Sequence, residues 1–244
     1  MHPILIKFGP ITIYSYGFMV ALGFSVSALL LYNRAPKFNM NRNLMIDYLI
    51  AILVAGIIGA RILYVLLNLS YYHANPVEIL NLAKGGLVWY GGFGAALLAT
   101  IWFTKVKKMD FWLAADLMSP YLALGQAFGR IGCYLNGCCY GIEAPQNFIF
   151  GERHPTQIYS AILLIIIAIV LIKWQDRRRF AGEVFLGYCM LYSCKRFLIE
   201  FIRGDNPKIF IGLTISQLIS IAALFTALII FKIRIDKWKN TSAG

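Results

Sequence analysis

Residues 156–174 read TQIYSAILLIIIAIVLIKW, and the part from Ala161 to Ile172 is apolar without interruption. A helix that crosses the hydrocarbon core of a bilayer needs about 20 mostly apolar residues. The stretch has this length and carries no charge before Lys173. It therefore predicts a membrane-spanning segment, which must be helical because lipid offers no hydrogen-bond partner for an open backbone.

Six other stretches meet the same criterion, although the third and fourth spans along the chain are short or polar in places. In chain order the seven predicted spans are Tyr14–Tyr32, Ile46–Leu67, Leu87–Thr104, Phe111–Phe128, Thr156–Trp174, Glu183–Phe201 and Ile211–Ile233. The sequence thus predicts an all-α integral membrane protein with seven transmembrane helices. It shows neither an internal repeat nor a linker, so we expect residues 1–244 to form a single transmembrane domain.

The composition agrees with this prediction. Hydrophobic residues make up 59% of the chain and charged residues 14%, whereas a soluble domain has about 45–50% and about 25%. The net charge of +12 would suggest nucleic acid as the partner of a soluble protein. Here the cations lie in short clusters between apolar runs, so membrane topology explains them and we expect no nucleic-acid partner.

The distribution of the cations predicts the orientation. Of 23 Lys and Arg residues, fourteen lie in the loops after the first, third and fifth spans and in the C-terminal tail, and six lie on the opposite side. Cytoplasmic loops carry the excess of cations, so we expect the N-terminus outside and the C-terminus inside. Two outer segments, about residues 68–86 and 129–155, are long enough to form a small head. No signal-peptide pattern precedes Pro10, so we expect the first apolar run to stay in the mature protein.

Ionisable groups inside a span are energetically unfavourable and usually face a cavity where they function. The predicted spans contain Arg61, Asp116, Glu183, Lys195, Arg196 and Glu200. Arg196 and Glu200 are four residues apart and share one helical face. Tyr192 and Arg203 extend this face, which gives a stripe of cation, anion and cation. The alternative is a structural ion pair, with Arg203 reaching toward the headgroups.

The segment Gly125–Gly141, GQAFGRIGCYLNGCCYG, carries the most unusual chemistry of the outer side. Its glycines permit close approach of the backbone. Arg130 offers a planar fork of donors that suits a phosphate. At the outer face of a membrane the simplest phosphate is a phospholipid headgroup. The alternative is a tight helix connection with an arginine that anchors to headgroups.

These residues resemble the signature of the prolipoprotein diacylglyceryl transferase family. The resemblance rests on Gly129-Arg130 with Asn136-Gly137 and Gly141, on RHPTQIY at 153–159, on RFLIEF at 196–201 with Arg203, and on YSYG at 14–17. The family transfers a diacylglyceryl group from phosphatidylglycerol to the lipobox cysteine of a prolipoprotein and releases glycerol phosphate. The resemblance therefore implies a multi-pass enzyme of the bacterial cell (inner) membrane that uses no metal and no cofactor, with phosphatidylglycerol, the prolipoprotein signal peptide and membrane lipids as partners.

The resemblance also implies roles for individual residues. Arg130 would hold the lipid phosphate, and Arg196 and Arg203 would stabilise charge on the leaving phosphate, with Glu200 orienting Arg196. Tyr16, Asn136, Gly141, Tyr192 and His154 are expected to shape the phosphatidylglycerol site.

The chain departs from the family pattern at two places. Tyr90 stands where many members have a histidine, and a tyrosine with a reference pKa near 10 is a poor base for a thiol. Tyr90 can still hydrogen-bond a phosphate oxygen, and His154 is the other candidate base. After Arg130, Cys133 and Cys138 replace the usual asparagine and carboxylate.

Cys133, Cys138 and Cys139 have three interpretations: packing at a tight turn, a disulfide on the oxidising side, or a metal-binding or nucleophilic thiol. No fourth zinc ligand lies nearby in the sequence. Two other functions stay open beside the transferase. A paralogue could pass the same lipid group to a different acceptor, which Tyr90 and the cysteines favour. A transporter or lipid-binding protein is the alternative of another class, although the sequence lacks the matched repeats of many transporters.

Overall fold

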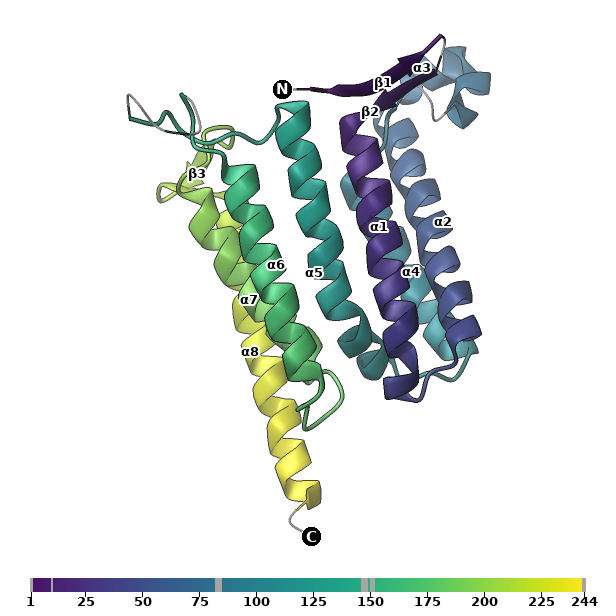
Figure 1. The fold of residues 1–244 in the computed structure, drawn as a ribbon, viewed down its shortest axis with the longest axis vertical. Coiled ribbons are helices and arrows are strands. Elements are labelled where there is room, and N and C mark those ends of the chain that lie inside the picture. Colours follow the sequence, from purple (N-terminus) through teal and green to yellow (C-terminus); the bar gives the residue numbers. More distant parts are fainter. Residues whose placement is uncertain (1, 10, 82–84, 146–148, 150–151, 243–244) are drawn as a thin grey trace. The chain divides into compact units, whose positions relative to one another are not determined.

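The computed structural model describes residues 2–9, 11–81, 85–145, 149 and 152–242. The chain divides into two compact units, one made of Met1–Leu31 with Ala115–Gly244 and the other of Tyr32–Ala114. Each unit is described by itself below, and Figure 1 gives the labels of the helices and strands.

The first unit contains most of the helices. The antiparallel hairpin of β1 (Ile4–Phe8) and β2 (Ile11–Tyr14) leads into α1 (Ser15–Arg34). The helices α5 (Phe111–Asn136), α6 (Thr156–Gln175) and α7 (Glu183–Glu200) follow. A short hairpin of β3 (Lys208–Phe210) and β4 (Leu213–Thr214) then precedes α8 (Ile215–Ser242), which packs along α7.

A buried apolar cluster joins α5, α6 and α7. Its members are Ala123, Ala127, Leu164, Ile167, Ala168, Leu171, Val184 and Tyr188. Small residues of α5 let the leucines and isoleucines of α6 approach closely, as is usual between membrane helices. The cluster therefore fixes the three helices that carry Arg130, the cysteine-rich turn and Glu200.

Asp116 is a structural residue of this unit. Its carboxylate accepts hydrogen bonds from the backbone N–H groups of Gly182 at 2.7 Å and Phe185 at 2.8 Å. These groups belong to the first turn of α7, whose donors lack partners within the helix. A negative charge at this end also suits the helix dipole. The buried charge of α5 thus anchors α7 through its backbone, whereas the sequence predicted a group that faces a cavity.

The second unit is built on α2 (Arg42–Leu67) and α4 (Trp89–Val106). A Cβ placed on Gly59 would lie 2.2 Å from Cβ of Ala95 and 2.6 Å from the carbonyl oxygen of Gly91, so the two helices meet at their backbones. The shorter helices are η1 (Ala35–Phe38), α3 (Leu69–Ala74) and η2 (Pro76–Leu80).

Arg61 organises the segment between α2 and α4. Its guanidinium donates to the carbonyl oxygens of Glu78, Ile79, Asn81, Gly85 and Gly86 over 2.7–3.1 Å. The side chain of Arg61 is 7% exposed, and all five hydrogen bonds go to backbone carbonyl oxygens. Arg61 thus binds the backbone of the predicted outer segment at 68–86 to α2.

Replacing Arg61 should make local unfolding of this segment easier. We expect Arg61→Ala to raise the rate of proteolysis around residues 76–88, since it removes five hydrogen bonds from a charged group to this segment, and each such bond is typically worth about 1.5–3 kcal/mol. Limited proteolysis of the purified protein in detergent measures the effect. The exposed Arg177 is the matched control, and Arg177→Ala should leave the cleavage pattern unchanged. Equal cleavage of both variants would contradict the role.

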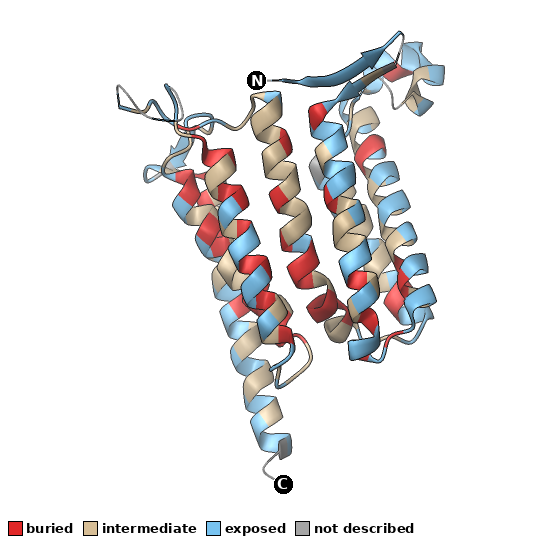
Figure 2. Ribbon diagram, viewed as in Figure 1, coloured by how far each residue is buried: buried red, intermediate tan, exposed pale blue. Residues whose placement is uncertain are grey.

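Each predicted span overlaps one long helix, and the all-α class is confirmed. Among the described residues, four helical segments are long and apolar enough to cross a membrane: Ser15–Phe38, Arg42–Leu67, Thr156–Gln175 and Ile215–Thr241. Large apolar side chains point outward from them, such as Ile58 at 53% and Phe225 at 60% exposed, and Figure 2 shows these exposed faces in pale blue along α2 and α8. In a bilayer, lipid covers such faces.

The bounds of two spans were wrong. The helix predicted over Ile211–Ile233 begins after β4, at Ile215, and continues to Ser242. The helix predicted to end at Phe128 continues to Asn136, so the first part of the glycine-rich motif is helical. A Cβ on Gly132 would lie 3.2 Å from the Tyr16 ring and 3.1 Å from Cβ of Met19. The glycine therefore brings the last turns of α5 against α1, where a larger residue would separate them.

Candidate functional site: a buried carboxylate among arginines

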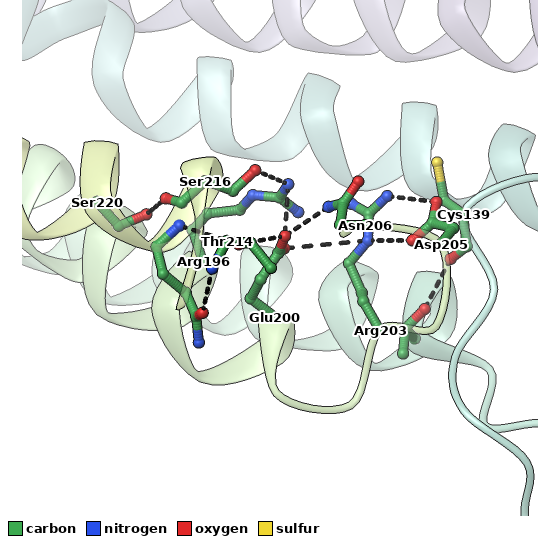
Figure 3. A network of polar contacts seen from close by, with 11 residues as sticks. Cys139, Arg196, Glu200, Arg203, Asp205, Asn206, Thr214, Ser216 and Ser220 are labelled. Carbon is green, nitrogen blue, oxygen red and sulfur yellow. Dashed lines mark hydrogen bonds and ion pairs between the residues drawn. The ribbon is translucent and has the colours of Figure 1, made fainter. Parts of the chain in front are cut away.

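Glu200 is the last residue of α7, and only 3% of its surface is exposed. Its Oε1 atom accepts hydrogen bonds from Thr214 at 2.9 Å and from the side-chain amide of Asn206. Its Oε2 atom lies 3.1 Å from a guanidinium nitrogen of Arg196 and 4.0 Å from Arg203. Figure 3 shows the carboxylate between these two arginines. A buried charge persists only when it is paired and hydrogen-bonded, and Glu200 meets both conditions.

Arg196 is held from two sides. The i, i+4 spacing on α7 sets it beside Glu200, and the same Nη2 atom donates to the hydroxyl of Ser216 at 2.8 Å. Ser216 lies in the first turn of α8. The predicted pairing of Arg196 with Glu200 is therefore confirmed. The second partner of Arg196, Ser216, lies on α8, which the spacing of residues along α7 could not indicate.

Arg203 lies just beyond α7 and forms a bidentate salt bridge with Asp205. Its Nε atom donates to Oδ1 at 2.8 Å and its Nη2 atom to Oδ2 at 2.6 Å. Burial alone would raise the pKa of Asp205, but the hydrogen bonds and the charge of Arg203 hold this pKa below its usual value. Arg203 thus has a fixed orientation, while its side chain remains 8% exposed.

Arg130 differs from the other two arginines. It is half-buried near the end of α5, and the described structure shows neither a hydrogen bond nor an ion pair for its guanidinium. It lies within electrostatic range of Lys195, as do Arg196 and Arg203. Four cations therefore share this region with the carboxylates of Glu200 and Asp205. Such an arrangement favours an anion, and Arg130 has a free fork of donors to bind it.

Gly141 brings two loops together. Its N–H donates to the carbonyl oxygen of His154 at 3.0 Å, and it forms an isolated β-bridge with Arg203. The N–H groups of Ile142 and Gly204 bond across the same junction, to Ile202 at 3.0 Å and Tyr140 at 3.3 Å. The junction ties the loop after α5 to the loop after α7, and so sets Arg203 beside the cysteine-rich turn.

A methyl group at Gly141 has no room. Its Cβ would lie 2.6 Å from the carbonyl oxygen of His154 and 2.8 Å from that of Ile202. We expect Gly141→Ala to destabilise the protein by about 1–3 kcal/mol, as overpacking does, and to lower turnover by displacing Arg203. Thermal unfolding and an activity assay measure both effects. Gly94→Ala is the control, because its Cβ would meet nothing within 4 Å; equal behaviour of the two variants would refute the argument.

The turn after α5 gathers three thiols. Gly137 (φ 78°) and Cys139 (φ 63°) both adopt the left-handed conformation, which folds Cys138 and Cys139 back over Cys133. The hydroxyl of Thr156 and the amide of Gln157, each at 2.7 Å, hold the carbonyl oxygens of Cys139 and Cys138. The three sulfur atoms all lie within 4.8 Å of one another. The sequence left packing, disulfide and metal open, and the structure adds that the thiols are clustered.

The pKa of the Cys139 thiol falls to about 5. A hydrogen bond from the Cys133 thiol is the largest cause, and the positive charges of Arg203 and Arg130 contribute, although burial opposes them. The Cys133 thiol and the two arginines thus favour the thiolate form of Cys139.

The remaining predicted residues lie at different places. Tyr16, on the first turn of α1, packs against Gly132 and lies within electrostatic range of Arg130 and the three cysteines. The ring of Tyr192 lies 4.5 Å from the ammonium group of Lys195. Asn136 is exposed at the end of α5.

His154 and Tyr90 belong to different units. The Nδ1 atom of His154 lies 3.3 Å from the hydroxyl of Tyr159, and His154 lines a pocket of about 610 Å³ with residues such as Tyr134, Tyr140 and Arg153. Tyr90 belongs to the second unit, where it is 71% exposed at the start of α4. Its place relative to Arg130 stays a prediction.

Several residues of the site were missed from the sequence. Asn206, Thr214 and Ser216 hold the Glu200–Arg196 pair, and Asp205 holds Arg203. One signal was present: Thr214 and Gln217 cap α8 reciprocally, with N–H to side-chain oxygen distances of 2.9 and 3.3 Å. The pattern T-x-x-Q before an apolar run is typical of this capping box, and it would have placed the start of the helix next to the site.

The apolar outer faces and this polar cluster define a helical membrane protein with a cationic site built from the ends of its helices. The family model for prolipoprotein diacylglyceryl transferase matches residues 3–233. The chain belongs to this family.

Curated relatives support the assignment over nearly the full length. The chain is 35% identical to the phosphatidylglycerol–prolipoprotein diacylglyceryl transferase of Clostridium tetani, over 98% of this chain and 100% of the relative. It is 32% identical to the enzyme numbered 1 of Clostridium perfringens, over 100% of this chain and 98% of the relative. The enzyme of Bacillus velezensis is 31% identical, over 96% of this chain and 92% of the relative.

Proposed function

We propose that this protein transfers the diacylglyceryl group of phosphatidylglycerol to the lipobox cysteine thiol of a prolipoprotein and releases glycerol phosphate. The observation that carries the proposal is the guanidinium of Arg130, which pairs with no described residue and lies within electrostatic range of Lys195, as do Arg196 and Arg203. Membership of the family supports the reaction, and the relatives named above carry this activity in their names.

Each residue has a defined part in this proposal. Arg130 binds a phosphate oxygen of the lipid through its free donors. Arg196 and Arg203 stabilise the charge that grows on the phosphate as the bond to the glyceryl carbon breaks. Such fixed donors act most strongly where water is excluded. Glu200 contacts both arginines and positions them, and it does not need to touch the lipid.

Tyr16, Tyr192, Asn136, Gly141 and His154 complete the phosphatidylglycerol site in the proposal. Tyr90 takes part by hydrogen bonding to the phosphate. The thiolate of the acceptor attacks the glyceryl carbon, and the electron pair of the broken C–O bond leaves on the phosphate oxygen.

The proposal includes the topology. Seven spans place residues 1–244 as one multi-pass domain in the bacterial inner membrane, with the N-terminus outside, the C-terminus inside and the site on the outer side. The cation-rich loops and C-terminal tail support this orientation. Cysteines introduced one at a time at Lys7 and Lys239 are treated with a membrane-impermeant reagent, and labelling above that of the five native cysteines tests it. Labelling of the tail in intact cells would contradict the orientation.

The activity test uses the purified protein, labelled phosphatidylglycerol and a lipobox peptide. A diacylglyceryl thioether on the peptide cysteine, detected by mass, supports the proposal. Consumption of the lipid with an unmodified peptide would point to a different acceptor, which the cysteine cluster and Tyr90 favour as the second candidate. A folded preparation that leaves both intact would favour a transporter or lipid-binding protein.

A further inference from the structure

The cluster of Cys133, Cys138 and Cys139 has no part in the proposed function. Its sulfur atoms come from two places, the last turn of α5 and the turn after it, yet all lie within 4.8 Å of one another. In a tetrahedral zinc–thiolate site, Zn–S bonds of about 2.3 Å place the sulfurs about 3.8 Å apart. The thiols therefore need to approach one another by only about 1 Å to hold one ion.

The backbone holds the cluster in place. Thr156 and Gln157, in the first turn of α6, fix the carbonyls of Cys139 and Cys138. The N–H of Cys138 donates to the carbonyl oxygen of Cys133 at 3.1 Å, which closes the turn. Packing at a turn requires small residues, but it does not require three sulfurs to converge. Convergence on a rigid frame is what a metal site needs.

The surrounding charges suit a thiolate-bound divalent cation. Three thiolates around Zn²⁺ carry one net negative charge, and a fourth thiolate would make it two. Arg130 and Arg203 lie within electrostatic range of Cys139 and offset this charge. Soft thiolate ligands select zinc over magnesium or calcium.

We propose that Cys133, Cys138 and Cys139 bind one Zn²⁺ ion and that its open fourth position takes the thiol of the acceptor substrate. The inference rests on the proposed function, because the acceptor is a cysteine thiol. Sites with three protein ligands and an open position are the catalytic kind of zinc site.

A bound Zn²⁺ ion removes the need for a histidine base at the position of Tyr90. A thiol bound to Zn²⁺ is deprotonated outright, so no side-chain base is needed. The released proton passes to water. The zinc-bound sulfur then forms the S–C bond to the glyceryl carbon as the C–O bond breaks, and the electron pair leaves with glycerol phosphate. The thioether product is neutral and a weaker ligand, so it dissociates and frees the position.

The first experiment measures metal binding without activity. The full-length protein is purified in reduced form, loaded with zinc and dialysed against a weak chelator, and metal is counted by mass spectrometry. We expect about one zinc per chain, and its loss in Cys133→Ser, Cys138→Ser and Cys139→Ser. Cys189→Ser and Cys194→Ser are the controls and should retain it. A metal-free reduced protein overturns the inference, as does retention in the three variants.

The second experiment tests the open position. Cobalt replaces zinc, and a lipobox peptide is added, with the same peptide carrying serine as the control. We expect the sulfur-to-cobalt charge-transfer band to rise with the cysteine peptide alone, as a fourth thiolate binds. If the charge-transfer band does not change when the cysteine peptide is added, the role of the open position is overturned.

Lipid transfer distinguishes the two proposals. Transfer at an undiminished rate by chelated, zinc-free protein overturns the zinc inference and leaves the proposed function standing. Zinc bound through the three cysteines without any modified peptide upholds the metal site and refutes the proposed acceptor. A disulfide within the cluster of the active enzyme, found by counting free thiols, refutes the metal site.

Discussion

Arg130→Ala should lower turnover of phosphatidylglycerol by about two to three orders of magnitude, since one positioned donor to developing charge is typically worth about 2.7–4 kcal/mol. The protein should still fold normally. In the described structure the guanidinium of Arg130 makes neither a hydrogen bond nor an ion pair, so its removal breaks no such bond within the protein. The measurement is the initial rate of thioether formation, with thermal unfolding of both proteins recorded in parallel.

Two further variants sharpen this test. Arg130→Lys keeps the charge but loses the planar fork, so it should recover only part of the lost rate. The exposed Arg177 is the control, and Arg177→Ala should retain full activity. An unchanged rate in Arg130→Ala would remove Arg130 from the phosphate site.

Glu200→Gln should abolish turnover and destabilise the protein as well. The carboxylate lies within 4.0 Å of Arg196 and Arg203 and accepts hydrogen bonds from Thr214 and Asn206. Removal of one partner from a buried ion pair costs about 3–5 kcal/mol, because the other charge is left uncompensated. The amide also presents a donor where a carboxylate oxygen accepted bonds.

Comparing Arg130→Ala with Glu200→Gln distinguishes a residue that binds the phosphate from one that positions the arginines. Arg130→Ala should lose activity with an unchanged unfolding temperature, whereas Glu200→Gln should lose both. The exposed Asp236 serves as the matched acidic control, and Asp236→Asn should change neither property. Full stability in Glu200→Gln would show that Glu200 does not hold the arginines.

The sequence by itself determined the long helices of the fold. Long apolar runs can be stable in lipid only as helices, so all seven predicted spans fall on helices. It also determined the stripe of Arg196 and Glu200, because a spacing of four residues places two side chains on one face of any helix. These features depend on neighbours along the chain, which is why they can be read without tertiary contacts.

Only the tertiary structure decided what the buried charges do. Asp116 caps a helix that starts 67 residues later, at Glu183, and Arg61 holds the carbonyls of a segment outside its own helix. Both seemed equivalent to Glu200 as ionisable groups within spans. The difference lies in partners distant in sequence, and a periodic pattern contains no information about them.

The cysteine cluster illustrates the same limit. The sequence shows Cys133, Cys138 and Cys139 near one another, but whether three sulfurs converge depends on backbone handedness. Left-handed residues at Gly137 and Cys139, and the bonds from Thr156 and Gln157, turn the chain so that they do. A non-glycine residue such as Cys139 adopts this conformation only where its surroundings hold it, so the tertiary contacts of α6, not the local sequence, decide the geometry of the thiols.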